Sequence, residues 1–104
     1  MSDSKPDVSR AEVEVFSSDV NSWVIRTPGR AFPATVIQGD TLFILFDEAQ
    51  KLLDELRGLS GIAPRLVEEA REHRDKIWQR LLHYETVLER HGIKLPYNRH
   101  RFPR

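Results

Sequence analysis

The residues best suited to chemistry lie between positions 28 and 41, in two short runs around an arginine and an aspartate. Arg30 carries a planar fork of hydrogen-bond donors that suits carboxylate and phosphate groups. With Gln38 and Asp40 it could form a corner that binds an anion or a nucleotide, because the start of a following helix also favours negative charge. The alternative, which we favour, is that Asp40 caps that helix, where it would repel a phosphate, and that Arg30 pairs with a carboxylate or with backbone carbonyls. The chain has neither a GxGxxG run nor a phosphate loop.

The four histidines do not predict a metal site. On a helix, His83 and His91 would lie about 12 Å apart along the axis, too far to share one ion. Glu69 and His73 have a spacing of four and could supply two ligands, but no third ligand is evident. The chain has no cysteine, and none of its serines stands in a nucleophile elbow. We therefore expect no catalytic residue, no metal, no cofactor and no enzymatic activity.

The end of the chain is basic. Residues 93–104 carry four positive charges with two interleaved aromatic residues, Tyr97 and Phe102. Such a segment could contact the phosphates and bases of a nucleic acid. The alternative, which we favour, is a solvated tail or one that folds back on the acidic front half of the chain.

Three large aromatic residues are candidate interface anchors, because aromatic side chains concentrate binding energy at protein interfaces. They are Trp23, Phe32 and Trp78. In so small a domain, core packing is the more common role for such residues.

The elements that position these residues are three strands and two helices. Segments 12–16, 23–26 and 35–38 have the alternation or β-branched content of strands. Pro28 and Gly29 supply turn chemistry between the second and third segments. Because the connections are short, the strands are expected to form an antiparallel meander.

From Asp40 onward the spacing of apolar residues becomes helical and predicts a helix to about Leu56. A second helix is expected from near Ile62, with Pro64 in its first turn, to just before Gly92. The fold class is therefore α+β, a three-stranded antiparallel β-meander packed against a two-helix antiparallel hairpin. The first helix is expected to form one broad apolar stripe: Leu42, Leu45, Phe46, Ala49, Leu52, Leu53 and Leu56.

The length of the second helix favours self-association. A helix of about 29 residues is about 43 Å long, whereas a compact chain of this size is about 33 Å across. We therefore expect a homodimer formed through the helices.

The 104 residues are enough for one domain, which we place at 11–92 between a disordered arm (1–10) and a basic tail (93–104). The net charge is zero, which gives no general attraction to nucleic acid. Residues 1–60 hold 10 acids and 6 bases, whereas residues 61–104 hold 6 acids and 10 bases. The lack of cysteine and of any apolar run near 20 residues favours the cytoplasm and no membrane association.

Five short motifs carry a resemblance to a known family. They are Pro28-Gly29-Arg30, Phe32-Pro33, Gln38-Gly39-Asp40, Leu82-His83-Tyr84-Glu85 and Leu95-Pro96-Tyr97. Over residues 12–97 the chain resembles a small bacterial family of uncharacterised proteins, a domain of unknown function. The resemblance implies a shape and no activity.

These observations favour a non-enzymatic protein-protein interaction module that acts as a homodimer; the immunity half of a bacterial toxin pair is one example of such a module. The alternatives are a domain that binds a small anionic ligand or a nucleotide through Arg30, Gln38 and Asp40, and contact with nucleic acid through the basic tail.

Overall fold

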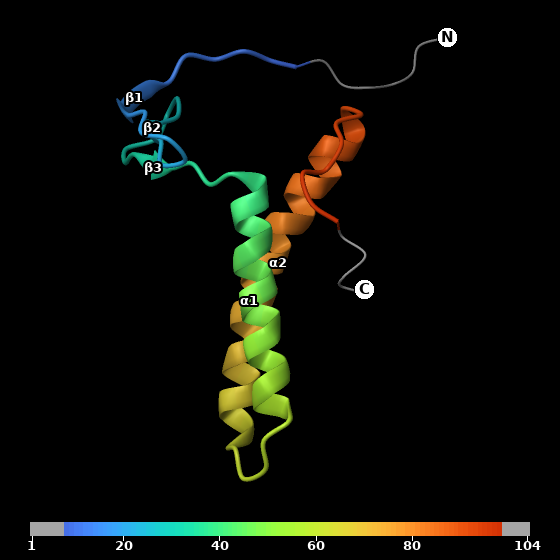
Figure 1. The fold of residues 1–104 in the computed structure, drawn as a ribbon. Helices are drawn as coiled ribbons and strands as arrows, with labels where there is room; N and C mark the ends of the chain where they lie inside the picture. Colours follow the sequence, from blue (N-terminus) through green and yellow to red (C-terminus); the bar gives the residue numbers. More distant parts are fainter. Residues whose placement is uncertain (1–7, 99–104) are drawn as a thin grey trace. The chain divides into compact units, whose positions relative to one another are not determined.

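The structure is a computed structural model that describes residues 8–98. The chain divides into two units, a strand unit up to Gln38 and a helical unit from Gly39 (Figure 1). The strand unit contains β1 (Glu14–Ser17), β2 (Val24–Arg26) and β3 (Ala34–Thr35), and the helical unit contains α1 (Gly39–Arg57) and α2 (Pro64–Arg90). The first seven residues of the expected arm and the last six of the expected tail lie outside the described residues.

The strands form one antiparallel sheet in the order β1-β2-β3. This sheet and the two packed helices confirm the predicted α+β class. β3 is shorter and begins earlier than the expected 35–38, because β2 has only three residues for it to pair with. One further backbone hydrogen bond, from the N–H of Val36 to the carbonyl of Trp23 (2.9 Å), extends the pairing.

The register places apolar residues on one face of the sheet. Val15 lies opposite Ile25, and Ile25 lies opposite Ala34, so these three side chains share a face. Alternation adds Trp23 to the same face. Glu14 and Arg26 face each other on the opposite side. A bulge between Val15 and Ser17 interrupts the register of β1.

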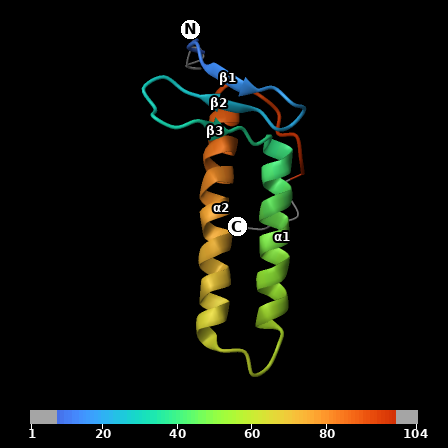
Figure 2. The ribbon, with the colours of Figure 1, turned by 90° about the vertical axis from the view of Figure 1, so that its left-hand side faces the viewer.

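The two helices form an antiparallel hairpin, and they run side by side in Figure 2. The aromatic rings of Phe46 and Trp78 lie 5.3 Å apart, and a turn further on Arg74 donates a hydrogen bond to Gln50 (2.6 Å). Pro64 lies in the first turn of α2 as expected, but it is the first residue of the helix, which therefore begins two residues later than the expected Ile62. The core between the helices contains Phe43, Phe46, Leu53 and Leu81.

The leucines of α1 do not form one stripe against α2. Phe43, Phe46 and Leu53 are buried in the hairpin, whereas Leu45 and Leu52 remain 40 % and 55 % exposed. These two exposed leucines belong to a second set of apolar residues, spaced by four, three and four positions, whose other two members are half-buried. We call this set the outer leucine stripe: Leu45, Ala49, Leu52 and Leu56. These spacings keep the four residues on one side of the helix.

The C-terminal end of α2 reverses the chain. Gly92 has φ 70°, and the N–H of Ile93 donates to the carbonyl of Leu88 (2.9 Å), which is a Schellman ending. The following residues return along the hairpin, so Tyr97 stacks on Phe43 with ring centroids 4.2 Å apart. Part of the expected tail is therefore packed against the helices.

Candidate functional site

The connection between β2 and β3 is a braced loop that presents Arg30. The N–H of Arg30 donates to the carbonyl of Thr27 (3.2 Å), and Gly29 has φ 78°. Proline followed by a glycine with positive φ is the pattern of a type II turn. Arg26 adds a brace, because its Nη1 donates to the carbonyl of Ala31 (3.4 Å). The loop is therefore held in shape by its own residues.

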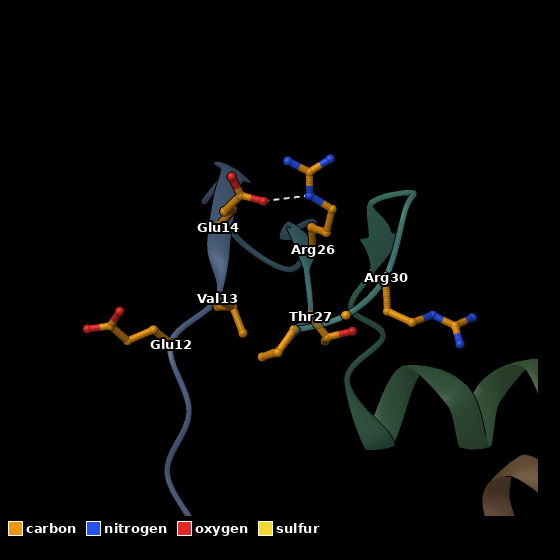
Figure 3. A pocket seen from close by; sticks show the side chains of 8 residues that line it. Glu12, Val13, Glu14, Arg26, Thr27 and Arg30 are labelled. Atoms are coloured by element: carbon orange, nitrogen blue, oxygen red, sulfur yellow. Dashed lines mark hydrogen bonds and ion pairs between the residues drawn. The ribbon is translucent and has the colours of Figure 1, made fainter.

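The charge of Arg26 is compensated within the sheet. Its Nε lies 2.5 Å from Oε1 of Glu14 (Figure 3). Its guanidinium carbon lies 5.5 Å from the centre of the Phe16 ring. The hydrogen bond from Arg26 lowers the pKa of Glu14, and the carboxylate in turn raises the pKa of Arg26. The side chain of Arg26 therefore links β2 to β1 through its ion pair with Glu14.

Arg30 points away from this pair (Figure 3). Within residues 8–98, no side chain forms an ion pair or hydrogen bond with its guanidinium. Arg30 lines two open hollows, one of about 310 Å³ beside β1 and one of about 360 Å³ that also contains Phe32 and Pro33. Phe32 is 82 % exposed. A guanidinium and a phenyl ring in one hollow can accept an acidic group carried on an apolar chain.

The corner of Arg30, Gln38 and Asp40 considered from the sequence stays a prediction, because Arg30 and Gln38 belong to the strand unit and Asp40 to the helical unit. The residues that line the two hollows include neither Gln38 nor Asp40. Gln38 is the last residue of the strand unit, and Asp40 is the second residue of α1. Oδ1 of Asp40 accepts a hydrogen bond from the N–H of Thr41 (2.8 Å), so this carboxylate serves the start of the helix.

The three interface candidates lie in different settings. Trp23 is exposed on the apolar face of the sheet, and Phe32 is exposed in the loop. Trp78 is half-buried in α2, where it packs against Phe46 of the hairpin core.

Three of the sequence motifs meet at the open end of the hairpin, which sequence reasoning did not anticipate. A methyl group on Gly39 would overlap the ring of Tyr84, so the backbone of α1 approaches α2 closely there. Glu85 is only 4 % exposed, and its Oε2 accepts a hydrogen bond from the hydroxyl of Tyr97 (2.7 Å). No periodic pattern in the sequence predicts the contact between Glu85 and Tyr97, because the chain reverses at Gly92 between them.

The described residues contain no candidate metal site and no helix that could span a membrane. Among residues 8–98, no three His, Asp or Glu side chains come together in a way that could hold a metal ion. Neither α1 nor α2 combines the length and the apolar character that crossing a membrane requires.

A three-stranded antiparallel sheet followed by a helical hairpin defines a small α+β protein. Residues 8–97 match the family of unknown function DUF6959, and the chain belongs to that family. The match confirms the resemblance to a domain of unknown function and begins at residue 8, four residues earlier than expected from the motifs. No curated protein and no solved structure matches the chain.

Proposed function

We propose that this chain is a protein-interaction module that acts without catalysis and pairs with a second copy through the outer leucine stripe of α1. The observation that carries the proposal is that Leu45 and Leu52 stay exposed on α1, although the apolar residues facing α2 are buried. A helix that pairs with only one neighbour needs only one apolar stripe. The second stripe has the alternating spacing of four and three that is typical of helix–helix interfaces.

The stripe is suited to a copy of itself. If two α1 helices pack antiparallel about a two-fold axis midway between Ala49 and Leu52, Leu45 meets Leu56 of the second copy and Ala49 meets its Leu52. Each small residue then faces a larger one, which is how helix surfaces interlock. The stripe is about 16 Å long, or about three helical turns. A self-complementary patch of this kind favours a closed dimer over an open chain.

The proposal includes two properties that follow from the composition and the site. No histidine, cysteine or serine lines either hollow, and the Glu14 carboxylate in the first hollow is paired with Arg26. A domain of this size without a single cysteine is typical of reducing compartments. The proposal therefore places the protein in the cytoplasm.

The test is the mass in solution of the full chain and of two charge variants. Light scattering at tens of micromolar is expected to give about twice the 12.1 kDa of one chain. Leu52→Glu is expected to give the single-chain mass, because each dimer would then bury two carboxylates in an apolar contact. A cost of about 2 kcal/mol for each of the two carboxylates, about 4 kcal/mol in all, corresponds to roughly thousandfold weaker association.

Ile44→Glu is the matched control. Ile44 is 54 % exposed, much like Leu52, but it lies about 110° around the helix from the centre of the stripe. This variant is expected to keep the double mass. A wild-type mass near 12.1 kDa would contradict the dimer, and dissociation by both variants alike would contradict the stripe as its interface.

A further inference from the structure

The strand unit has a second surface with a chemistry different from that of the leucine stripe. β3 is an edge strand of the sheet, and both of its residues are exposed. The loop that leads into β3 carries the uncompensated Arg30 and the exposed Phe32. We propose that the β3 edge and this loop bind an extended acidic peptide segment of another protein, which adds to the sheet as a fourth strand.

The backbone of β3 offers the hydrogen bonds for such an addition. In an antiparallel ladder, alternate residues of an edge strand direct their N–H and C=O groups toward the neighbouring strand and away from it. The N–H of Val36 donates inward to Trp23, so the N–H and C=O of Thr35 point outward. Unpaired edge groups of this kind are the template that a peptide strand uses in β-augmentation.

Arg30 selects for negative charge on that peptide. It precedes β3 by four residues and lines the same hollow as Phe32, Pro33 and Ala34. A peptide strand lying along β3 would therefore continue past this guanidinium, which can accept a carboxylate through two parallel hydrogen bonds. Arg26 does not compete, because Glu14 already holds it.

Phe32 provides the apolar part of the contact. Aromatic residues and arginines are enriched among the few residues that carry most of the binding energy at protein interfaces. Prolines on both sides of the loop and the brace from Arg26 to Ala31 fix its shape before binding. A preformed loop loses less conformational entropy when a partner docks.

The other classes of occupant fit less well. A nucleic acid has no backbone amides to pair with Thr35, so it would leave the edge unused. The β1 edge is less suitable for an acidic strand, because Glu12 and Glu14 lie along it and the bulge after Val15 interrupts its ladder. A peptide with acidic and apolar residues in alternation fits the β3 edge, the guanidinium and the phenyl ring together.

The test selects peptides from a random dodecapeptide display library on the immobilised full chain. The enriched sequences are expected to alternate acidic and apolar residues. In complex with the best synthetic peptide, the amide of Thr35 is expected to exchange its hydrogen more slowly. Arg30→Glu and Phe32→Ser are each expected to weaken binding about tenfold or more, measured by fluorescence polarisation.

Matched controls come from the helical unit. Arg80→Glu changes an exposed arginine of α2, and Leu59→Ser removes an exposed apolar side chain beyond α1; both are expected to leave peptide affinity unchanged. The proposal is overturned by failure to enrich any sequence, by enriched sequences without acidic residues, or by binding that Arg30→Glu leaves intact. It does not depend on the leucine stripe, because the mass of the free chain reports on that surface separately.

Discussion

The contact between Tyr97 and Glu85 shows how much one residue outside the helices can contribute. Glu85 is almost fully buried, and a buried carboxylate is costly unless hydrogen bonds compensate it. The hydroxyl of Tyr97 supplies one such bond, while its ring packs on Phe43. The segment after α2 thus completes the polar interior of the hairpin.

We expect Tyr97→Phe to destabilise the protein by about 1–3 kcal/mol, because the ring stack is kept while the buried carboxyl group of Glu85 loses a hydrogen-bond donor. Urea unfolding at neutral pH measures the change. Combining it with Glu85→Gln should show a coupling of about 0.5 kcal/mol or more between the two sites.

Tyr84→Phe is the matched change, since the hydroxyl of Tyr84 makes no hydrogen bond within residues 8–98. Equal costs for the two Tyr→Phe variants, or strictly additive effects at 85 and 97, would show that the buried hydrogen bond does not stabilise the hairpin.

At the scale of elements, the periodic patterns predicted which segments become strands and helices, and tertiary pairing decided the rest. The place of Pro64 in the first turn of α2 was predicted, because proline fits there, whereas the helix begins two residues later than the expected Ile62. The bounds of β3 were not, because they depend on the length of β2. The arc of leucines in α1 was visible in the sequence, but the burial of Leu53 and the exposure of Leu45 and Leu52 depend on the angle at which α2 docks.

The same reasoning explains what was missed at the candidate site. Arg30 was identified from its residue type and its turn, which are local features. That Gln38 and Asp40 fall in different units was not predictable, because no local feature marks a unit boundary between them. The Glu85–Tyr97 pair joins a helix to a segment beyond a chain reversal, and no periodic pattern spans such a reversal.

The close approach of α1 and α2 at Gly39 gives a prediction about how the two elements fit. Gly39→Ala is expected to cost about 1–3 kcal/mol, because the added methyl group must displace the half-buried ring of Tyr84. Thermal unfolding measures the loss, and replacing Tyr84 with leucine in the same chain should recover part of it.

Gly58→Ala serves as the reference near the other end of α1, where the new Cβ would lie 3.6 Å from the nearest atom, an ordinary contact. Replacing a glycine at such a site is neutral or slightly stabilising, because the unfolded chain loses conformational freedom. If Gly39→Ala proved as harmless as Gly58→Ala, the helices would not need glycine at their contact.

At the scale of the whole molecule, both units leave apolar side chains exposed: Trp23 and Val15 on the sheet, Leu45 and Leu52 on the hairpin. Strands of four, three and two residues bury little surface by themselves, and stable sheets need a covered apolar face. If association covers part of this surface, the apparent free energy of unfolding should increase with the concentration of the protein.

We therefore expect the midpoint of thermal unfolding to rise with protein concentration, since association with a second folded copy stabilises the native state and not the unfolded chain. If the dissociation constant is near 1 µM, going from 1 to 100 µM should add about 1 kcal/mol per chain to the apparent stability. Calorimetry over that range gives the shift.

In the Leu52→Glu chain the midpoint should stay constant, whereas in Ile44→Glu it should rise as in the wild type. A wild-type midpoint that does not change with concentration would count against the two-fold dimer and leave the peptide site on β3 as the surface still to be tested.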